Sequence, residues 1–323
     1  MHCEGPRVAN LAGVMRMEKV KPTLTGMLFA ELRRELVSLL RGLSEEEWGR
    51  PTMAAKWNVK DVTLHLLGVD VGNLSRRRDG FSLEADLSSY QKLVAFINEI
   101  NASWVAAGQR MSAPVLIDLL DHVGRQVDEY FAGLDPFAMG EPVSWAGPDP
   151  MPLWFDVARE YTERWHHQQQ IRDATGRAGL YVRRLFEPVM DTFVRALPWT
   201  FRDVEARQGT MVRLVVTDGL KKEWLLVRGA GKWDLFEGDI HSSARNTEGG
   251  AAREGSPSAS SHMGGAESGH EKSAADAEVI VPAQNAWKIF TRGIRGAEAR
   301  GRAGIRGDRV LGEKVLETVA VIA

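Results

Sequence analysis

A glutamate and a histidine near the middle of the chain have the spacing to bind one metal ion together. Glu163 and His167 are four residues apart in the segment EYTERWHHQQQIRDATG, so on a helix they share one face. Helix bundles bind metals with such pairs, completed by a ligand from a facing helix. On a solvated surface the pair would be only a weak contact. Phe155, Tyr161 and Ile171 instead indicate a substantially buried helix.

A third ligand is expected from another helix, and His65 is the natural candidate. It lies within the apolar segment TLHLLG, where an imidazole without a partner is costly. A single histidine among leucines is more commonly a core residue that is hydrogen-bonded to a neighbour. The Glu163 and His167 pair favours the other interpretation, a three-residue metal site.

Two neighbours leave the ligand set open on spacing alone. His166 follows Glu163 by three residues and lies about 100° around the helix from His167, so both histidines are not expected to bind one ion. Glu160 is seven residues before His167 and is a second candidate carboxylate. Of the other histidines, His122 falls within a predicted helix, and four fall in segments expected to be disordered: His2, His241, His262 and His270.

The elements that must position these residues are predicted to be helices. Apolar residues recur at spacings of three and four from Leu24 to Leu43, and Asn58 with Asp61 is a helix-start signal before the helix that carries His65. The segment from Asp135 to Pro152 has five prolines and is expected to be a loop. Further helices are predicted over Ser88–Ala107, Ala113–Ala132, Leu153–Thr175 and Leu180–Leu197, the last with Pro188 inside it.

The pattern changes after Pro198. MVRLVVT, EWLLVRG and KWDLFEG are β-like, and Asp218-Gly219 is a hairpin signal. Residues 241–276 are rich in Ser, Gly, Ala and Glu and are expected to be a disordered insertion. AEVIVPAQNAWKIFTRG predicts a strand and a proline-started helix, and the last segment predicts a short helix and a final strand. The expected fold class is α plus α+β: a helical domain over 21–197, an α+β domain over 198–323, and a disordered or extended start over 1–20.

Composition excludes several classes of protein. The chain has 323 residues, 44% hydrophobic and 26% charged, with a formal net charge of −2. No dense basic stripe for nucleic acid, no membrane span and no signal peptide is found, so a cytoplasmic monomer or homodimer is expected. Cys3 is the only cysteine, and it precedes two other plausible starts, Met15 and Met17. Any thiol chemistry therefore needs a thiol from outside.

The segment LSEEEWGRPTMAAKWNVKDVTLHLLG resembles the mycothiol-dependent maleylpyruvate isomerase branch of the DinB-like superfamily. That family has Trp, Pro-Thr, Trp-x-Val-x-Asp-Val and then a metal-binding His. A second family motif is a Glu, three residues, and then His followed by Gln and an apolar residue, and it selects His167 over His166. The matching residues are Trp48, Pro51, Thr52, Trp57, Val59, Asp61, Val62 and His65, then Glu163, His167, Gln169 or Gln170, and Ile171.

The resemblance implies an up-down helix bundle followed by a small sterol-carrier-like α+β domain. It also implies a divalent metal on His65, Glu163 and His167, with zinc the first choice and nickel or ferrous iron the alternatives. A low-molecular-weight thiol such as mycothiol would add to an activated double bond and leave after rotation, as in an isomerase or S-transferase. Two alternatives are a non-catalytic binder of metal and an apolar ligand, and a metal-dependent hydrolase with Glu160 as its base.

The resemblance also implies a functional arginine in the second domain, and Arg292 is the best candidate for it. The helix dipole also favours a cation at a helix C-terminus, and this is the preferred explanation of Arg292. Trp57 and Trp287 are expected to pack in the core or between domains. Asp61 is expected either to orient His65 or simply to cap its helix.

Overall fold

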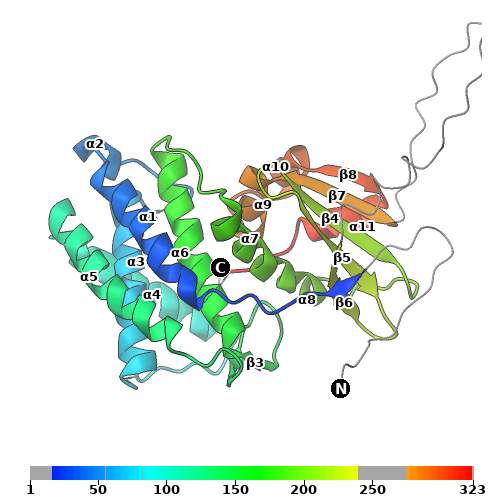
Figure 1. Cartoon of the computed structure of the whole chain (residues 1–323), viewed down its shortest axis with the longest axis horizontal. Coiled ribbons are helices and arrows are strands. Elements are labelled where there is room, and N and C mark those ends of the chain that lie inside the picture. The colour runs from blue at the N-terminus through cyan, green and yellow to red at the C-terminus, as the bar shows by residue number, and fades with distance from the viewer. Residues whose placement is uncertain (1–16, 55, 82, 239–274, 322–323) are drawn as a thin grey trace, which may run out of the picture.

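The computed structural model describes residues 17–321 except 55, 82 and 239–274. Helices of the first part of the chain lie beside a sheet formed mostly by the last part, with one short strand from the start of the chain (Figure 1). Cys3 and nearly all of the predicted insertion lie outside the described residues. None of the described helices is long and apolar enough to span a membrane.

The predicted helices are present, some with shifted ends. The first helix was predicted from Leu24 but begins later. Leu24 and Met27 are 56% and 77% exposed, and Phe29 is the first apolar residue of the segment to be buried in the core. The proline-rich loop contains no helix and forms an antiparallel pair, β2 (Met139–Pro142) and β3 (Pro150–Pro152). The helical elements are η1 (Gly26–Leu28), α1 (Phe29–Arg41), α2 (Glu45–Trp48), α3 (Val59–Asn73), the π-helical turn η2 (Leu74–Arg78), α4 (Tyr90–Gly108), α5 (Ala113–Ala132), α6 (Leu153–Ala174), α7 (Arg183–Phe193), η3 (Val194–Ala196) and α8 (Leu197–Thr200).

A capping box fixes the start of α3. The Asn58 side chain accepts a hydrogen bond from the Asp61 amide at 2.9 Å, and the Asp61 carboxylate accepts one from the Asn58 amide at 3.0 Å. Two donors that would lack helical partners are thereby satisfied. The cap sets where the helix begins and hence which residues face its neighbours, including His65 about two turns later.

Helix α4 crosses α3 at close range. The Trp104 indole donates to the Leu64 carbonyl at 2.9 Å. Glycines permit the approach: a Cβ at Gly68 would lie 2.7 Å from the Trp104 ring, and one at Gly108 would lie 2.4 Å from the Leu64 side chain. Since real Cβ contacts are longer, larger residues at either glycine would push the helices apart.

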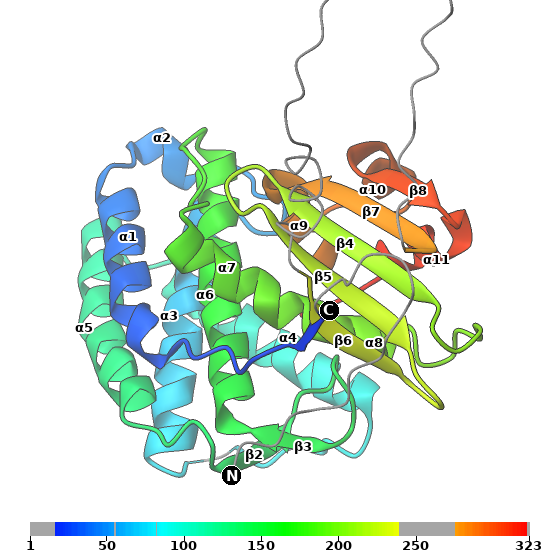
Figure 2. The ribbon, with the colours of Figure 1, turned by 45° about the vertical axis from the view of Figure 1, so that its right-hand side comes forward.

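The sheet has the order β1-β6-β5-β4-β7-β8, and only β4 and β7 run parallel. The predicted hairpin after β4 is present, with Asp218 and Gly219 in the left-handed region at φ 47° and 77°. Figure 2 shows the six strands with α9 beside them. The elements are β1 (Glu18–Lys19), β4 (Met211–Thr217), β5 (Lys222–Arg228), β6 (Trp233–Glu237), β7 (Ala277–Pro282), α9 (Ala283–Phe290), α10 (Gly296–Arg302), β8 (Gly304–Gly307) and α11 (Arg309–Val315).

Two predictions for the last part of the chain are wrong. No strand follows α11 among the described residues; Ala320 and Val321 are instead buried in the core, and the Ala320 amide donates a hydrogen bond to the Phe290 carbonyl at 2.9 Å. The insertion was predicted to extend to Asp276, but the Asp276 carboxylate accepts a hydrogen bond from the Met211 amide at 2.7 Å. The start, predicted to be disordered or extended, has Glu18 and Lys19 in a short strand that pairs with β6.

The described residues form two hydrophobic clusters. One runs from the helices into the sheet and includes Phe29 and Val321. The other lies among the helices and includes Leu64 of α3 and Leu116 of α5. At the junction, Trp287 of α9 lies edge-on to Trp165 of α6 with ring centroids 5.9 Å apart, and its indole donates to the Tyr181 hydroxyl at 3.1 Å. Trp287 is fully buried, as expected for a packing residue. The division into two domains at residue 197 stays a prediction.

Candidate metal centre

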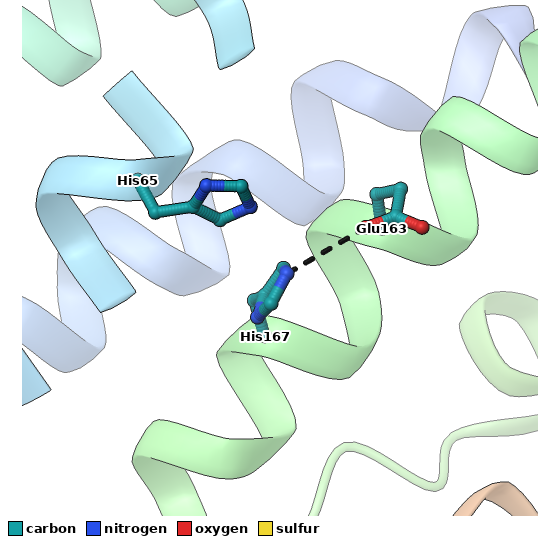
Figure 3. A group of neighbouring side chains, drawn as sticks. All are labelled: His65, Glu163 and His167. Carbon is teal, nitrogen blue, oxygen red and sulfur yellow. Dashed lines mark ion pairs between the residues drawn. The ribbon is translucent and has the colours of Figure 1, made fainter. Parts of the chain in front are cut away.

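His65 of α3 meets Glu163 and His167 of α6 where the two helices face each other (Figure 3). One ligand atom from each residue lies within 4.8 Å of the other two. The His65 and His167 ring centroids are 4.7 Å apart, and His167 Nε2 lies 3.6 Å from Glu163 Oε2. Across the described residues, no second group of His, Cys, Asp or Glu converges in this way.

Two features of the trio suit a metal ion. The buried Nδ1 of His65 has no hydrogen-bond partner among the described groups, a costly arrangement that a metal would satisfy. His167 Nδ1 lies 2.9 Å from the Gln170 side-chain oxygen, which orients the ring with Nε2 toward Glu163. In tetrahedral zinc sites, ligand atoms are roughly 3.3 Å apart. Small side-chain rotations would therefore close the trio around an ion.

The protonation states also suit a divalent cation. Burial lowers the pKa of His65 to about 3, with His167 and His166 adding to the effect against the opposing influence of Glu163 and Asn101. Burial alone would raise the pKa of Glu163, but His166, His167 and Arg159 outweigh it and lower that pKa to about 2. At neutral pH the site therefore offers the free imidazole lone pair of His65 beside the Glu163 carboxylate.

The two alternative ligands are placed elsewhere. His166 is buried, with Nδ1 2.9 Å from the Thr162 carbonyl, and its ring lies tilted against that of His167, outside the trio. Both carboxylate oxygens of Glu160 are occupied, and the neighbouring guanidinium groups hold its pKa well below the usual range. Its partners are Arg77 and Arg159 on Oε1, and Asn73 and Arg164 on Oε2.

Arg292 is not part of the trio. It is exposed, lies at the end of α9 with φ 59°, and contacts none of the three residues. The next residue, Gly293, lies against Met53 in the loop before α3. A role for Arg292 at the site stays a prediction.

Trp57 is closer to the trio than its expected packing role suggested. Its half-buried ring lies 4.7 Å from that of His65 and 6.5 Å from that of His167. Thr52 holds it there, since its amide and hydroxyl both donate to the Trp57 carbonyl, at 3.1 and 2.8 Å. The spacing of residues in the sequence did not predict this contact. Trp57 lies in the loop before α3, and the turn of that loop brings its ring back to the helix.

Asp61 acts as a cap. One carboxylate oxygen accepts from the Asn58 amide and the other from the Gln109 side chain at 2.6 Å. No hydrogen bond joins Asp61 to His65 among the described residues, so of the two expected roles the capping one is present.

Fold and site together define a helix bundle with a two-histidine, one-carboxylate centre. Residues 29–172 match the family model of the mycothiol maleylpyruvate isomerase N-terminal domain, the family that the motifs of this segment resemble. The match includes all three residues of the trio.

Two solved structures are also similar: the crystal structure of the mycothiol-dependent maleylpyruvate isomerase, and that of a point mutant of this enzyme. The identities are 11% and 10%, and the TM-scores are 0.46 and 0.45. Each comparison covers 84% of this chain and 90% of the other. No curated protein matches the chain.

Proposed function

We propose that this protein binds a divalent metal through His65, Glu163 and His167 and acts with a low-molecular-weight thiol as a cis–trans isomerase or S-transferase. The observation that carries the proposal is the convergence of the trio around a buried, unpartnered His65 nitrogen. It occurs within a segment that matches a thiol-dependent isomerase family.

A bound ion, with zinc the first choice and nickel or ferrous iron the alternatives, would act as a Lewis acid that lowers the pKa of a thiol. Three protein ligands leave a position open for an exogenous group, as in catalytic rather than structural sites. The thiol is external, because Cys3 is the only cysteine in the chain and lies far from His65 in sequence. In the matched family that thiol is mycothiol.

The chain's own residues orient and shield the centre. Gln170 fixes the ring of His167, and Trp57 covers the rings of both histidines. In the proposed isomerisation a thiolate adds to an activated double bond, the resulting single bond rotates, and the same thiolate leaves. Thiol and proton are returned, so no other reactant is consumed.

The alternative of a metal-dependent hydrolase lacks an available general base at the predicted residue. Glu160 was the predicted general base, but its oxygens accept hydrogen bonds from three arginines and Asn73 and its pKa is held low. A carboxylate in that state does not take a proton from water near neutral pH. No observation favours a purely binding role.

Metal analysis of the purified protein tests the ligand set. The wild type is expected to retain a stoichiometric divalent metal. His65→Ala and His167→Ala should each weaken metal binding by more than the roughly 10–100-fold cost of losing a ligand's orienting partner. His122→Ala is a matched control, because His122 is exposed on α5. A wild type without metal would refute the site, and metal loss in His166→Ala but not in His167→Ala would move the ligand by one residue.

Thiol dependence is tested in cobalt-substituted protein. Thiols should shift the visible absorption of the wild type, and the shift should be absent in His65→Ala. A cobalt protein that does not respond to thiols would contradict the thiol-dependent activity while leaving the metal site intact.

A further inference from the structure

Helix α6 has an accessible stripe on an otherwise buried surface. From Trp154 to Ile171 every residue is buried except Arg159 and Glu163, whose side chains are 17% and 21% exposed. These two residues and His167 follow one another at intervals of four, so they share one helical face. An open strip therefore runs from the candidate metal centre toward Arg159, about 6 Å along the helix from Glu163.

Arg159 uses only part of its guanidinium for ion pairs. Nε and Nη2 donate to Asp156 at 3.1 and 2.9 Å, and Nη2 also donates to Glu160 at 2.5 Å. Nη1 makes no hydrogen bond with a described residue and is not among the buried unpartnered atoms, so it faces the accessible side. An arginine fixed on one edge with a free donor on the other is preorganised to bind an anion.

The facing helix leaves room for such an anion. Gly72 and Arg76 follow His65 by seven and eleven residues, which keeps them on or near its side of α3 and η2. A Cβ at Gly72 would meet no atom within 4 Å. Arg76 has no hydrogen bond or ion pair with a described residue, although Arg77, Glu160, Asp156 and Arg159 all influence its pKa, which burial lowers.

One guanidinium group of this region has no carboxylate partner. Arg77, Arg159 and Arg164 each donate to one or more of Asp70, Asp156 and Glu160. Arg76 makes no hydrogen bond or ion pair with a described residue, so its charge is available to an anionic ligand.

We infer that Arg159 and Arg76 form an anion-binding subsite beside the metal centre, which holds a carboxylate of the molecule that reacts there. The inference rests on the proposed function and names the residues that would bind an acidic group of its substrate. It places the substrate-binding cation in the helical part of the chain, on α6 and η2, and not at Arg292 after α9.

Cobalt-substituted protein tests the subsite with thiols that differ in charge. Mercaptoacetate, 3-mercaptopropionate and neutral 2-mercaptoethanol are titrated into the wild type, Arg159→Gln and Arg76→Gln. Arg78→Gln is the matched control, since Arg78 lies in the same turn but is exposed and paired with Asp79. The dissociation constant of each carboxylate thiol relative to that of 2-mercaptoethanol should rise about tenfold in Arg159→Gln, as expected for one lost charge-assisted hydrogen bond. It should rise in Arg76→Gln as well and stay unchanged in Arg78→Gln.

The outcomes separate the two proposals. If no thiol changes the absorption spectrum of the cobalt-substituted wild type, the proposed function is wrong, and the proposed subsite, which depends on it, is wrong as well. If all thiols bind but the ratio is the same in the wild type and both variants, the subsite alone is wrong. If Arg159→Gln loses its metal, the exposed Arg76→Gln still decides the question.

Discussion

Two glutamates one turn apart on α6 have different surroundings. Glu160 is buried among three arginines and Asn73, whereas Glu163 is partly exposed beside two histidines. Spacing predicted the pair Glu163 and His167 but ranked Glu160 as a second candidate, because both carboxylates lie on similar sides of one helix. Arg159 and Arg164 lie on α6 itself, but the other two partners of Glu160, Asn73 and Arg77, come from α3 and η2, and local sequence does not encode those contacts.

The paired state of Glu160 predicts how it contributes to stability. Glu160→Gln is expected to lower the free energy of unfolding at pH 7 by about 3–5 kcal/mol, because it leaves buried arginines with too few carboxylates. The pKa of Glu160 is lowered in the folded state, so its contribution is complete above its unfolded value near 4.5 and is lost as the pH falls below that value.

Urea unfolding of both proteins between pH 3 and pH 7 measures this contribution. The difference between them should be constant above about pH 5 and should shrink below about pH 4.5. A difference that grows on acidification would mean that the pKa of Glu160 is raised, contrary to the ion pairs that surround it.

Among the structural elements, the long helices follow from periodicity and caps, and the short elements do not. Helix α5 has the bounds predicted from its sequence, and α3 begins at its predicted Asn58 cap. The strand β8, the helix α10 and the π-helical turn η2 were not predicted. Short strands depend on the neighbour they pair with more than on their own residues, and β8 reads only GIRG. The turn η2 carries Arg76 and Arg77. Because this turn was not predicted, the sequence did not indicate that these two arginines lie near the candidate site.

Two glycines of α3 predict opposite responses to the same substitution. Gly68→Ala should destabilise the protein by about 1–3 kcal/mol, because its Cβ would lie 2.7 Å from Trp104 and would separate α3 from α4. Gly72→Ala should instead stabilise it by about 0.5–1 kcal/mol, since its Cβ meets no atom within 4 Å and alanine favours a helix. Chemical denaturation of both variants checks the pair. Equal effects would contradict the close crossing of the two helices.

On the scale of the whole molecule, the sequence predicted two domains. Of the two hydrophobic clusters of the described residues, the larger includes residues of both parts, and the other lies among the helices. Aromatic side chains of α6, α7 and α9 interlock, and Lys288 of α9 forms an ion pair with Asp173 of α6 at 2.5 Å. The change from helical to strand pattern after Pro198 falls within α8, and the first strand after it, β4, begins at Met211. The change carried no information on how much apolar surface the two parts share, because that depends on long-range packing.

The shared core predicts that heat unfolds both parts together. Trp287→Ala should cost about 3–5 kcal/mol, because it empties a large buried volume and removes the indole that donates to the Tyr181 hydroxyl. Helical circular dichroism and the absorption of bound cobalt should then lose signal at one common, lower temperature, although Trp287 lies in the sheet part and the metal centre lies in the helices. Trp199→Ala is the control, since Trp199 is half-buried on α8 against Arg202 and should cost less. Two separate transitions in the wild type would instead show that the parts unfold independently, as the predicted boundary at residue 197 implies.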